Sequence, residues 1–123
     1  MQIGDVAERT GLSLRTIRHY EEVDLLPDPQ RSQGGFRLYT EDAVQRLLLV
    51  KQMKPLDFTL EEMREILELR ERLANQRLSA RTRAGLQGRL EHYQQLADAK
   101  LDELEQRLRS ARKFTDELRD TLG

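Results

Sequence analysis

The chain has 123 residues, of which 35% are charged and 5% aromatic, and its formal net charge is −1. This length allows one small domain, or one small domain joined to an extended helix, and the dense charge with only 7 glycines and 3 prolines favours long exposed helices. The absence of cysteine excludes disulfides, thiolate metal sites and thiol redox sensing, and the longest apolar run, residues 47–50, predicts no membrane-spanning segment.

The first ten residues contain acids and no apolar leader, so we expect no signal peptide and a cytoplasmic location. The charges are unevenly distributed. Residues 9–20 and 29–40 contain arginines and no acid, whereas residues 21–28 contain four acids and no base. A surface that meets phosphates must be locally free of carboxylates, whatever the total charge. The two acid-free stretches are therefore the candidate nucleic-acid surface.

Two short helices are predicted at the N-terminus, over residues 4–10 and about 14–23, with Val6 of the first facing inward. Gly11 can adopt the positive φ that ends a helix, and Ser13 is a good N-cap for the next one. The inward side of the second helix is expected to carry Leu14, Ile17 and the ring of Tyr20. Its other side is expected to carry Arg15, Thr16, Arg18 and His19.

A small β-hairpin is predicted over residues 30–39, where Gly34 and Gly35 precede an alternation of bulky and polar groups. Thr40 is the expected cap of a third helix at about residues 41–52. After a turn at residues 55–58, Thr59 and Glu62 have the spacing of a capping box, which predicts the start of a fourth helix.

Residues 79–122 contain no proline and have the pattern of one long helix. Counted as heptads, eight of its ten a and d positions are apolar, over more than four heptads. They are Leu90, Ala97, Leu101, Leu104, Leu108, Ala111, Leu118 and Leu122. Such a narrow stripe is typical of a coiled-coil seam and favours dimerisation, although a helix folded back onto its own domain is the alternative.

Ala7, Gly11 and Ile17 have the spacing of a helix-turn-helix, in which the second helix enters the major groove with its N-terminal residues toward the bases. The hydrogen-bonding residues there are Ser13, Arg15, Thr16, Arg18 and His19. The predicted fold is mainly α: a winged helix-turn-helix DNA-binding domain (residues 1–75) with a small β-hairpin wing, followed by a long coiled-coil dimerisation helix (residues 79–123).

Three motifs then carry a family resemblance. They are IGDVAERTGLSLRTIRHYEE with LLP (residues 3–22 and 25–27), GFRLY (residues 35–39) and DFTLEEM (residues 57–63). In this order and spacing they resemble the DNA-binding domain of the MerR family of bacterial transcription regulators, over about residues 2–72. The long last helix resembles the antiparallel dimerisation helix of that family.

The resemblance implies a role for each matched residue. Arg15, Thr16, Arg18, His19 and Tyr20 would lie in or beside the major groove, and Arg31, Phe36 and Arg37 would hold the flanking backbone. Leu38 and Tyr39 are expected in the wing core rather than on DNA. Asp24 and Asp57 stand where the family usually has glycine; because Asp tolerates left-handed backbone, we expect both turns to survive at some cost. The family often has tyrosine at positions 19 and 36.

The resemblance also implies a homodimer on a pseudo-palindromic promoter site, which bends and untwists the spacer for RNA polymerase in the bacterial nucleoid. No cofactor or metal site is predicted, since the chain has two separated histidines and no cysteine. The chain lacks the parts of an active site, so an enzyme is not expected. The helix ends where the sequence ends, which suggests a short member without a separate effector domain.

The effector itself is not predicted. A small apolar pocket lined by Met63, Leu67 and Tyr93 is one possibility, and control without a small molecule is another. The alternative functions are a coiled-coil protein-interaction module and an effector-less repressor regulated by a partner protein.

Overall fold

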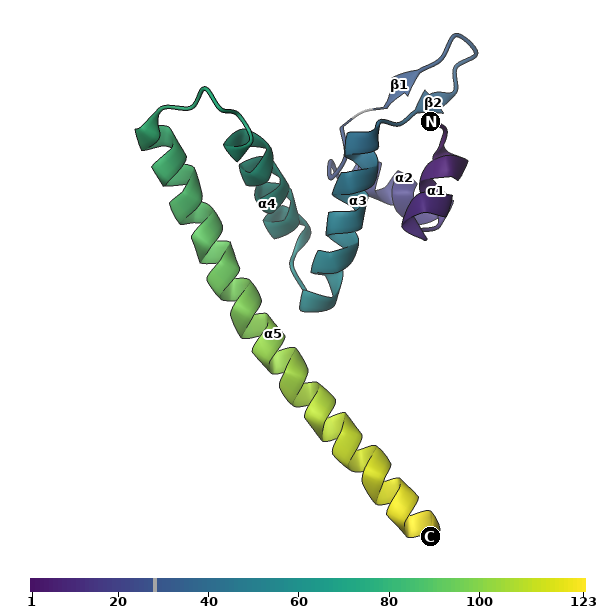
Figure 1. Ribbon diagram of the computed structural model, residues 1–123. Helices are drawn as coiled ribbons and strands as arrows, with labels where there is room; N and C mark the ends of the chain where they lie inside the picture. The colour runs from purple at the N-terminus through teal and green to yellow at the C-terminus, as the bar shows by residue number, and fades with distance from the viewer. Residues whose placement is uncertain (28) are drawn as a thin grey trace. The chain divides into compact units, whose positions relative to one another are not determined.

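The computed structural model describes residues 1–27 and 29–123 (Figure 1). The chain divides into two compact units, Met1–Arg72 and Leu73–Gly123. The first unit contains α1 (Ile3–Thr10), α2 (Leu14–Glu22), β1 (Gln30–Arg31), β2 (Arg37–Leu38), α3 (Glu41–Met53), the 3₁₀ helix η1 (Lys54–Leu56) and α4 (Leu60–Leu73), whose last residue begins the second unit. The second unit contains α5 (Ala80–Leu122). The predicted helices and hairpin are confirmed, with helix ends within a residue or two of those expected.

The helices begin where the sequence places capping residues. The Ser13 hydroxyl accepts from the Thr16 amide at 3.1 Å, and the Thr40 hydroxyl accepts from the Ala43 amide at 3.1 Å. At the start of α4 the Thr59 amide donates to the Glu62 carboxylate at 2.9 Å, and the Glu62 amide donates to the Thr59 hydroxyl at 3.1 Å. These bonds satisfy amides that have no partner inside the helix.

The core of the first unit is a set of aliphatic side chains at helical spacing. The fully buried ones include Val6, Ile17, Leu25, Val44, Leu47, Val50 and Met63. Burying each such side chain contributes roughly 1.5–3 kcal/mol, so these residues hold the helices of the first unit together. The expectation for Leu14 was wrong: it is 42% exposed, because it is the first residue of α2 and lies about one turn before the buried Ile17.

Two turns adopt left-handed backbone at residues other than glycine. Asp24 has φ 62° and Asp57 has φ 59°, which confirms the expectation that aspartate would support these turns. Gly11, between α1 and α2, has φ 72°, as the helix-turn-helix spacing predicts. Because a left-handed residue strains most L side chains, the two aspartates are sites of stored backbone strain.

Cationic side chains of α3 and α4 hold the carbonyl ends of α1 and α2. The Lys51 ammonium donates to the Thr10 carbonyl at 2.8 Å, and the Arg46 guanidinium donates twice to the Leu25 carbonyl, at 2.8 and 3.0 Å. A nitrogen of Arg64 donates to the carbonyl of Val23. The Thr10 and Val23 carbonyls lie at helix ends, where they lack partners within the helix, whereas the Leu25 carbonyl lies in the turn after α2. Together these bonds fix how α1 and α2 sit on α3.

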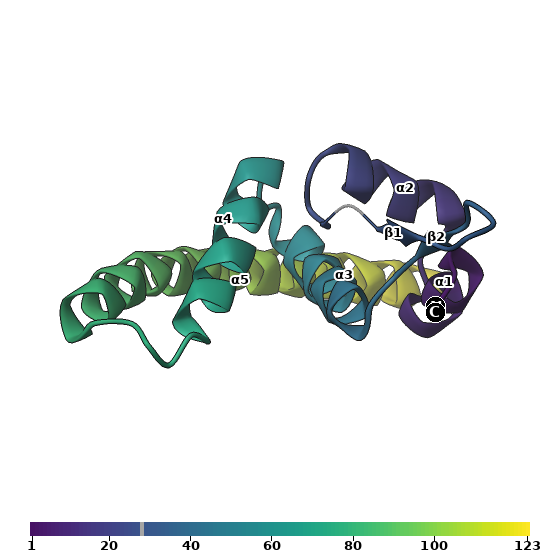
Figure 2. The ribbon, with the colours of Figure 1, turned by 90° about the horizontal axis from the view of Figure 1, so that it is seen from above.

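The hairpin lies beside α2, as the view from above shows (Figure 2). Its two strands are antiparallel and pair Gln30 with Leu38 and Arg31 with Arg37. The loop is closed by bonds from the Ser32 amide to the Phe36 carbonyl at 2.8 Å and from the Gly35 amide to the Ser32 carbonyl at 2.9 Å.

The second unit is dominated by the 43-residue helix α5. Its apolar stripe is half-buried at Leu90, Ala97 and Leu104 but exposed at Ala111 and at the remaining leucines. Leu101, Leu108 and Leu118 are 45%, 49% and 48% exposed. In the part of the chain that the structure describes, no helix is long and apolar enough to cross a membrane.

Candidate nucleic-acid interface

The outer face of α2 is polar, as its sequence predicts. Arg15, Arg18 and His19 are exposed, Thr16 is half-buried, and Tyr20 is only 5% exposed. The Ser13 hydroxyl, which caps α2, also donates to the Thr16 hydroxyl at 2.8 Å. Three side chains that can donate to bases or phosphates therefore leave one helix in the same direction, while the ring of Tyr20 belongs to the core.

The hairpin places two arginines directly opposite each other. Arg31 on β1 pairs in register with Arg37 on β2, so both side chains lie on the same face of the two-stranded ribbon. Like charges at directly opposite positions destabilise a hairpin, which makes this pair costly unless an anion lies nearby. The Arg31 guanidinium donates to the Gly35 carbonyl at 3.2 Å, and Phe36 at the tip is 61% exposed.

Glu21 of α2 supplies a counter-charge to the hairpin. Its carboxylate lies 3.2 Å from a guanidinium nitrogen of Arg37 and accepts a hydrogen bond from the Tyr39 hydroxyl. The Glu21 side chain is 9% exposed, whereas that of Arg37 is 39% exposed. Burial, and after it the hydrogen bond to the Glu21 carboxylate, together raise the pKa of Tyr39 to about 12. Tyr39 is buried, as predicted for a residue of the wing core.

The first residue of the chain is tied to the same hairpin. The Met1 ammonium donates to the Tyr39 carbonyl at 3.0 Å, and the Tyr39 amide donates back to the Met1 carbonyl at 2.7 Å. The end of β2 is therefore held from two sides, by the start of the chain and by α2.

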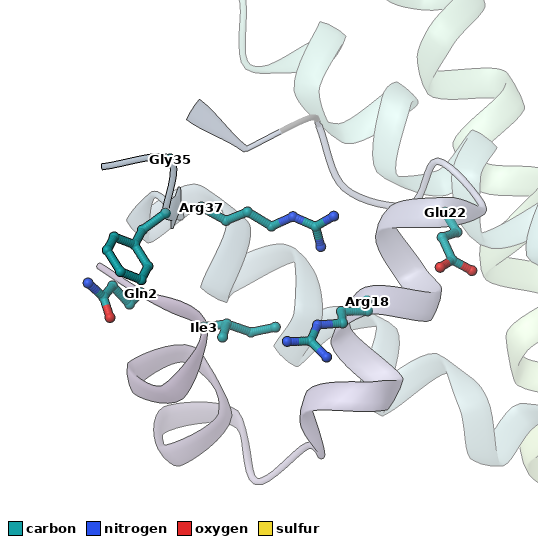
Figure 3. A pocket seen from close by; sticks show the side chains of 7 residues that line it. Gln2, Ile3, Arg18, Glu22, Gly35 and Arg37 are labelled. Atoms are coloured by element: carbon teal, nitrogen blue, oxygen red, sulfur yellow. The ribbon is translucent and has the colours of Figure 1, made fainter. Parts of the chain in front are cut away.

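Between α2, the hairpin and the start of α1 lies an open pocket of about 370 Å³. It is lined by Gln2, Ile3, Arg18, Glu22, Gly35, Phe36 and Arg37. The guanidinium groups of Arg18 and Arg37 point into the space from α2 and from the hairpin (Figure 3). A pocket with two converging guanidinium groups is suited to an anionic oxygen such as that of a phosphate.

The expectation of an acid-free surface was wrong at the hairpin. Glu22 lines the pocket and Glu21 pairs with Arg37, because folding brings the end of α2 against residues that follow it by about fifteen positions. The two acids are separated from the hairpin along the sequence, so the charge pattern did not predict that they lie beside it in space. The sequence patterns did not predict two features of this candidate site: the ion pair between Glu21 and Arg37, and the position of Arg31 directly opposite Arg37.

No group of three or more His, Asp or Glu side chains that could hold a metal ion occurs within residues 1–27 and 29–123. Met63, Leu67 and Tyr93, suggested as lining an apolar effector pocket, are each buried. Because the first two belong to one unit and Tyr93 to the other, that pocket remains a prediction.

The chain matches two family models. Residues 1–69 match the MerR HTH family regulatory protein, and residues 44–121 match the model described as MerR, DNA binding. The chain belongs to the MerR family, whose members are DNA-binding transcription regulators and not enzymes. The geometry of α2 and the hairpin is that of its winged helix-turn-helix.

The family relatives differ in how much of their length is matched. The chain is 35% identical to the HTH-type transcriptional regulator YfmP of Bacillus subtilis, over all of this chain and 91% of that one. It is 41% identical to the mercuric resistance operon regulatory protein of Bacillus cereus, over 54% of this chain and 50% of that one. The second match therefore covers about half of each protein.

Solved structures show the same architecture. The transcription regulator PbrR691 of Ralstonia metallidurans, solved in complex with lead(II), is 33% identical with a TM-score of 0.60, over 98% of this chain and 84% of that one. HiNmlR, a MerR family regulator lacking the sensor domain and solved on promoter DNA, is 22% identical with a TM-score of 0.66, over 94% and 86%. That second likeness concerns the fold alone.

Proposed function

We propose that this regulator binds a pseudo-palindromic promoter site as a homodimer, with α2 in the major groove and the hairpin on the flanking backbone. The observation that carries the proposal is the pocket into which Arg18 and Arg37 both point. Arg15, Thr16, Arg18 and His19 would lie in or beside the groove, and Tyr20 would lie beside it with its ring packed in the core. Arg31, Phe36 and Arg37 would hold the backbone.

The two groups of residues would have different tasks. Exposed arginines on a recognition helix can make bidentate bonds to guanine, which distinguish one base pair from another. Arginines on a hairpin beside that helix meet phosphates, which set position and salt dependence but carry no sequence information. Arg18 is the residue best placed for both tasks, because it is exposed on α2 and also lines the pocket shared with Arg37.

The exposed stripe of α5 supports dimerisation. Leu101, Leu108 and Leu118 recur at coiled-coil spacing and are nearly half exposed in a single chain. Exposing a continuous apolar stripe to water is unfavourable in free energy, and a second copy of the same helix would cover the stripe through knobs-into-holes packing. The dimerisation residues proposed are Leu90, Ala97, Leu101, Leu104, Leu108, Ala111 and Leu118.

The charges that flank this stripe favour an antiparallel pair. The heptad e positions are acidic at Asp98 and Glu105 and basic at Arg112 and Arg119. In an antiparallel coil, e positions of one helix face e positions of the other, so the acidic half meets the basic half of the partner. In a parallel coil, g positions face e positions, so the attraction between Lys100 and the partner's Glu105 would be offset by the repulsion between Arg107 and the partner's Arg112.

A two-fold dimer requires a two-fold operator, with half-sites separated by the length of the coil. We propose that the dimer bends and untwists the promoter spacer and so realigns the promoter elements for RNA polymerase. That distortion costs free energy, which the backbone contacts of the hairpin would offset.

The first experiment is a footprint of the purified protein on DNA from upstream of its own gene, followed by anisotropy titration of the protected duplex. Arg18→Ala should lose ~1–3 kcal/mol of binding free energy and relax the preference at one base pair. Arg109→Ala is the matched control, since this arginine is exposed at an outer heptad position of α5. Equal losses in the two variants would refute the assignment of Arg18 to the bases.

A second experiment tests the antiparallel coil. One variant reverses the acids (Asp98→Lys with Glu105→Lys), and the other reverses the bases (Arg112→Glu with Arg119→Glu). Each variant alone should dimerise more weakly than the unchanged protein in sedimentation, and an equimolar mixture should form a heterodimer. Two variants that each self-associate normally, and show no preference for each other, would contradict this orientation.

The alternative is a coiled-coil interaction module, or an effector-less repressor controlled by a partner protein. It is favoured only by the exposed stripe of α5, which another helix could also cover. Salt separates the two: specific DNA binding weakens steeply with ionic strength, whereas an apolar coil partnership does not. A dimer that protects no DNA at low salt would favour the alternative.

A further inference from the structure

The ion pair between α2 and the hairpin has a consequence for how DNA is held. We propose that Glu21 is a positioning residue, which docks Arg37 against α2 and withholds part of its charge from the DNA phosphate. This inference rests on the proposed function and adds to it: the hairpin would bind phosphate through a cation that is already half-neutralised within the protein.

The geometry shows why Glu21 has this role. Its carboxylate is almost fully buried and is shared between the Arg37 guanidinium and the Tyr39 hydroxyl. A buried carboxylate is stable only when paired, so a shift of the hairpin that separates Arg37 from Glu21 is unfavourable while Glu21 stays buried. The contact therefore sets the position of the hairpin relative to the groove-reading face of α2.

The same contact keeps part of Arg37 available. Its side chain is 39% exposed and lies on the wall of the pocket, and a guanidinium has five N–H donors, more than one carboxylate can occupy. Arg37 can thus meet a phosphate without leaving Glu21. Because Arg31 lies directly opposite, the carboxylate also offsets the repulsion between the two cations.

Salt dependence gives a direct readout. Each phosphate neutralised by a free cation contributes about −0.9 to the slope of log K against log salt. A cation that already holds a carboxylate neutralises less phosphate charge, so fewer counterions are released from the DNA and its contribution to the slope is smaller. Arg37 should therefore add less than a full charge to the slope in the unchanged protein and close to a full charge once Glu21 is neutral.

The experiment titrates the full-length protein with a labelled promoter duplex and a random duplex of equal length over a series of KCl concentrations. It compares the unchanged protein, Glu21→Gln, Arg37→Ala and the double variant. We expect Arg37→Ala to flatten the slope by less than about 0.4 in the unchanged protein and by about 0.9 in the Glu21→Gln background. Glu21→Gln alone should also bind the random duplex more tightly, which lowers the specificity ratio.

Glu8→Gln is the matched control, because it removes the same charge from an exposed side chain of α1 that does not line the pocket. In that background the effect of Arg37→Ala should stay at its original size. An effect of Arg37→Ala that is equal in all three backgrounds would overturn the inference. If the unchanged protein shows no salt-dependent binding to either duplex, the proposed function fails instead, so the two failures are distinguishable.

Circular dichroism shows whether each variant is folded, and the pKa of Tyr39 then reports on the charge beside its hydroxyl. Glutamine retains an oxygen that accepts from the Tyr39 hydroxyl but carries no charge, so the pKa of Tyr39 should fall from about 12 while the hairpin stays paired. Absorbance of the phenolate over an alkaline titration measures that shift. A change in salt slope together with a lowered phenol pKa in a folded protein supports the positioning role.

Discussion

Gly11, in the turn between α1 and α2, provides the sharpest test of how this surface is built. It has φ 72°, and a Cβ added there would lie 3.0 Å from the Lys51 ammonium. The same ammonium donates to the Thr10 carbonyl at 2.8 Å and so closes the end of α1. Gly11→Ala therefore perturbs both the backbone and this cap, whereas Gly35→Ala at φ 81° meets no described atom within 4 Å.

The expected loss of stability in Gly11→Ala is the sum of the backbone strain at residue 11 and the loss of the Lys51 hydrogen bond. Left-handed backbone costs an L residue about 1–2 kcal/mol, of which roughly 0.5–1 kcal/mol is recovered because alanine has less freedom than glycine when unfolded. That leaves about 1 kcal/mol for Gly35→Ala. Displacing Lys51 from its carbonyl costs roughly a further 0.5–1.5 kcal/mol, the net worth of one such bond. We expect Gly11→Ala to lower the free energy of unfolding by about 1.5–2.5 kcal/mol in total.

The assay is urea unfolding followed by circular dichroism at one fixed protein concentration, because a dimer's stability depends on concentration. A double-mutant cycle with Lys51→Met separates the two terms: without the ammonium, Gly11→Ala should cost only about 1 kcal/mol. If the cost is the same with and without Lys51, or no larger than that of Gly35→Ala, the assignment of the cap is refuted. If Gly11→Ala stabilises the protein, the backbone argument fails as well.

Three further predictions follow from contacts in the same unit. Asp57→Gly should be neutral or stabilising, whereas Asp57→Ala should destabilise the protein by about 1 kcal/mol, because residue 57 has φ 59°. Thermal unfolding measures both changes, and the opposite order of stabilities would contradict backbone strain at this position. Hydrogen bonding by Arg9 lowers the pKa of Glu41 to about 2. The ionised Glu41 therefore stabilises the folded protein fully above pH 4.5, and this contribution is lost as the pH falls toward 2. Glu41→Gln should flatten that acid limb of an unfolding series, and an unchanged limb would show that other carboxylates cause it. Ile17→Ala, on the buried face of α2, should cost ~2–5 kcal/mol but Ile17→Val only ~0.5–1.5 kcal/mol, measured by urea unfolding. Equal costs would mean that neighbouring side chains fill the cavity left by the larger deletion.

Much of the fold could be predicted because its signals are local. The caps at Ser13 and Thr40 and the reciprocal pair of Thr59 and Glu62 each involve residues three positions apart, and the structure has all of them. Helical spacing likewise separated the buried Ile17 from the exposed arginines of α2. Helical spacing did not predict the exposure of Leu14. The spacing indicates which side of a helix faces inward, but not whether a neighbouring helix extends far enough to cover the first turn.

The family motifs also follow from sequence, and with them the expectation that α2 and the hairpin form one DNA-binding surface. The left-handed turns at Asp24 and Asp57 were expected for the same reason: the residue types and their places in the motif restrict the backbone. The seam of α5 is a periodicity that sequence alone displays, although what covers its exposed leucines is a proposal.

What only the tertiary structure decided is which charges meet. A two-residue turn centred on Gly34 and Gly35 would have placed Leu38 opposite Arg31, but the longer loop places Arg37 there instead. Glu21 reaches Arg37 only because α2 and the hairpin pack on the same core. Local signals act over a few residues, whereas electrostatic neighbours are set by packing of segments far apart in the chain, and no pattern along the sequence carries that information.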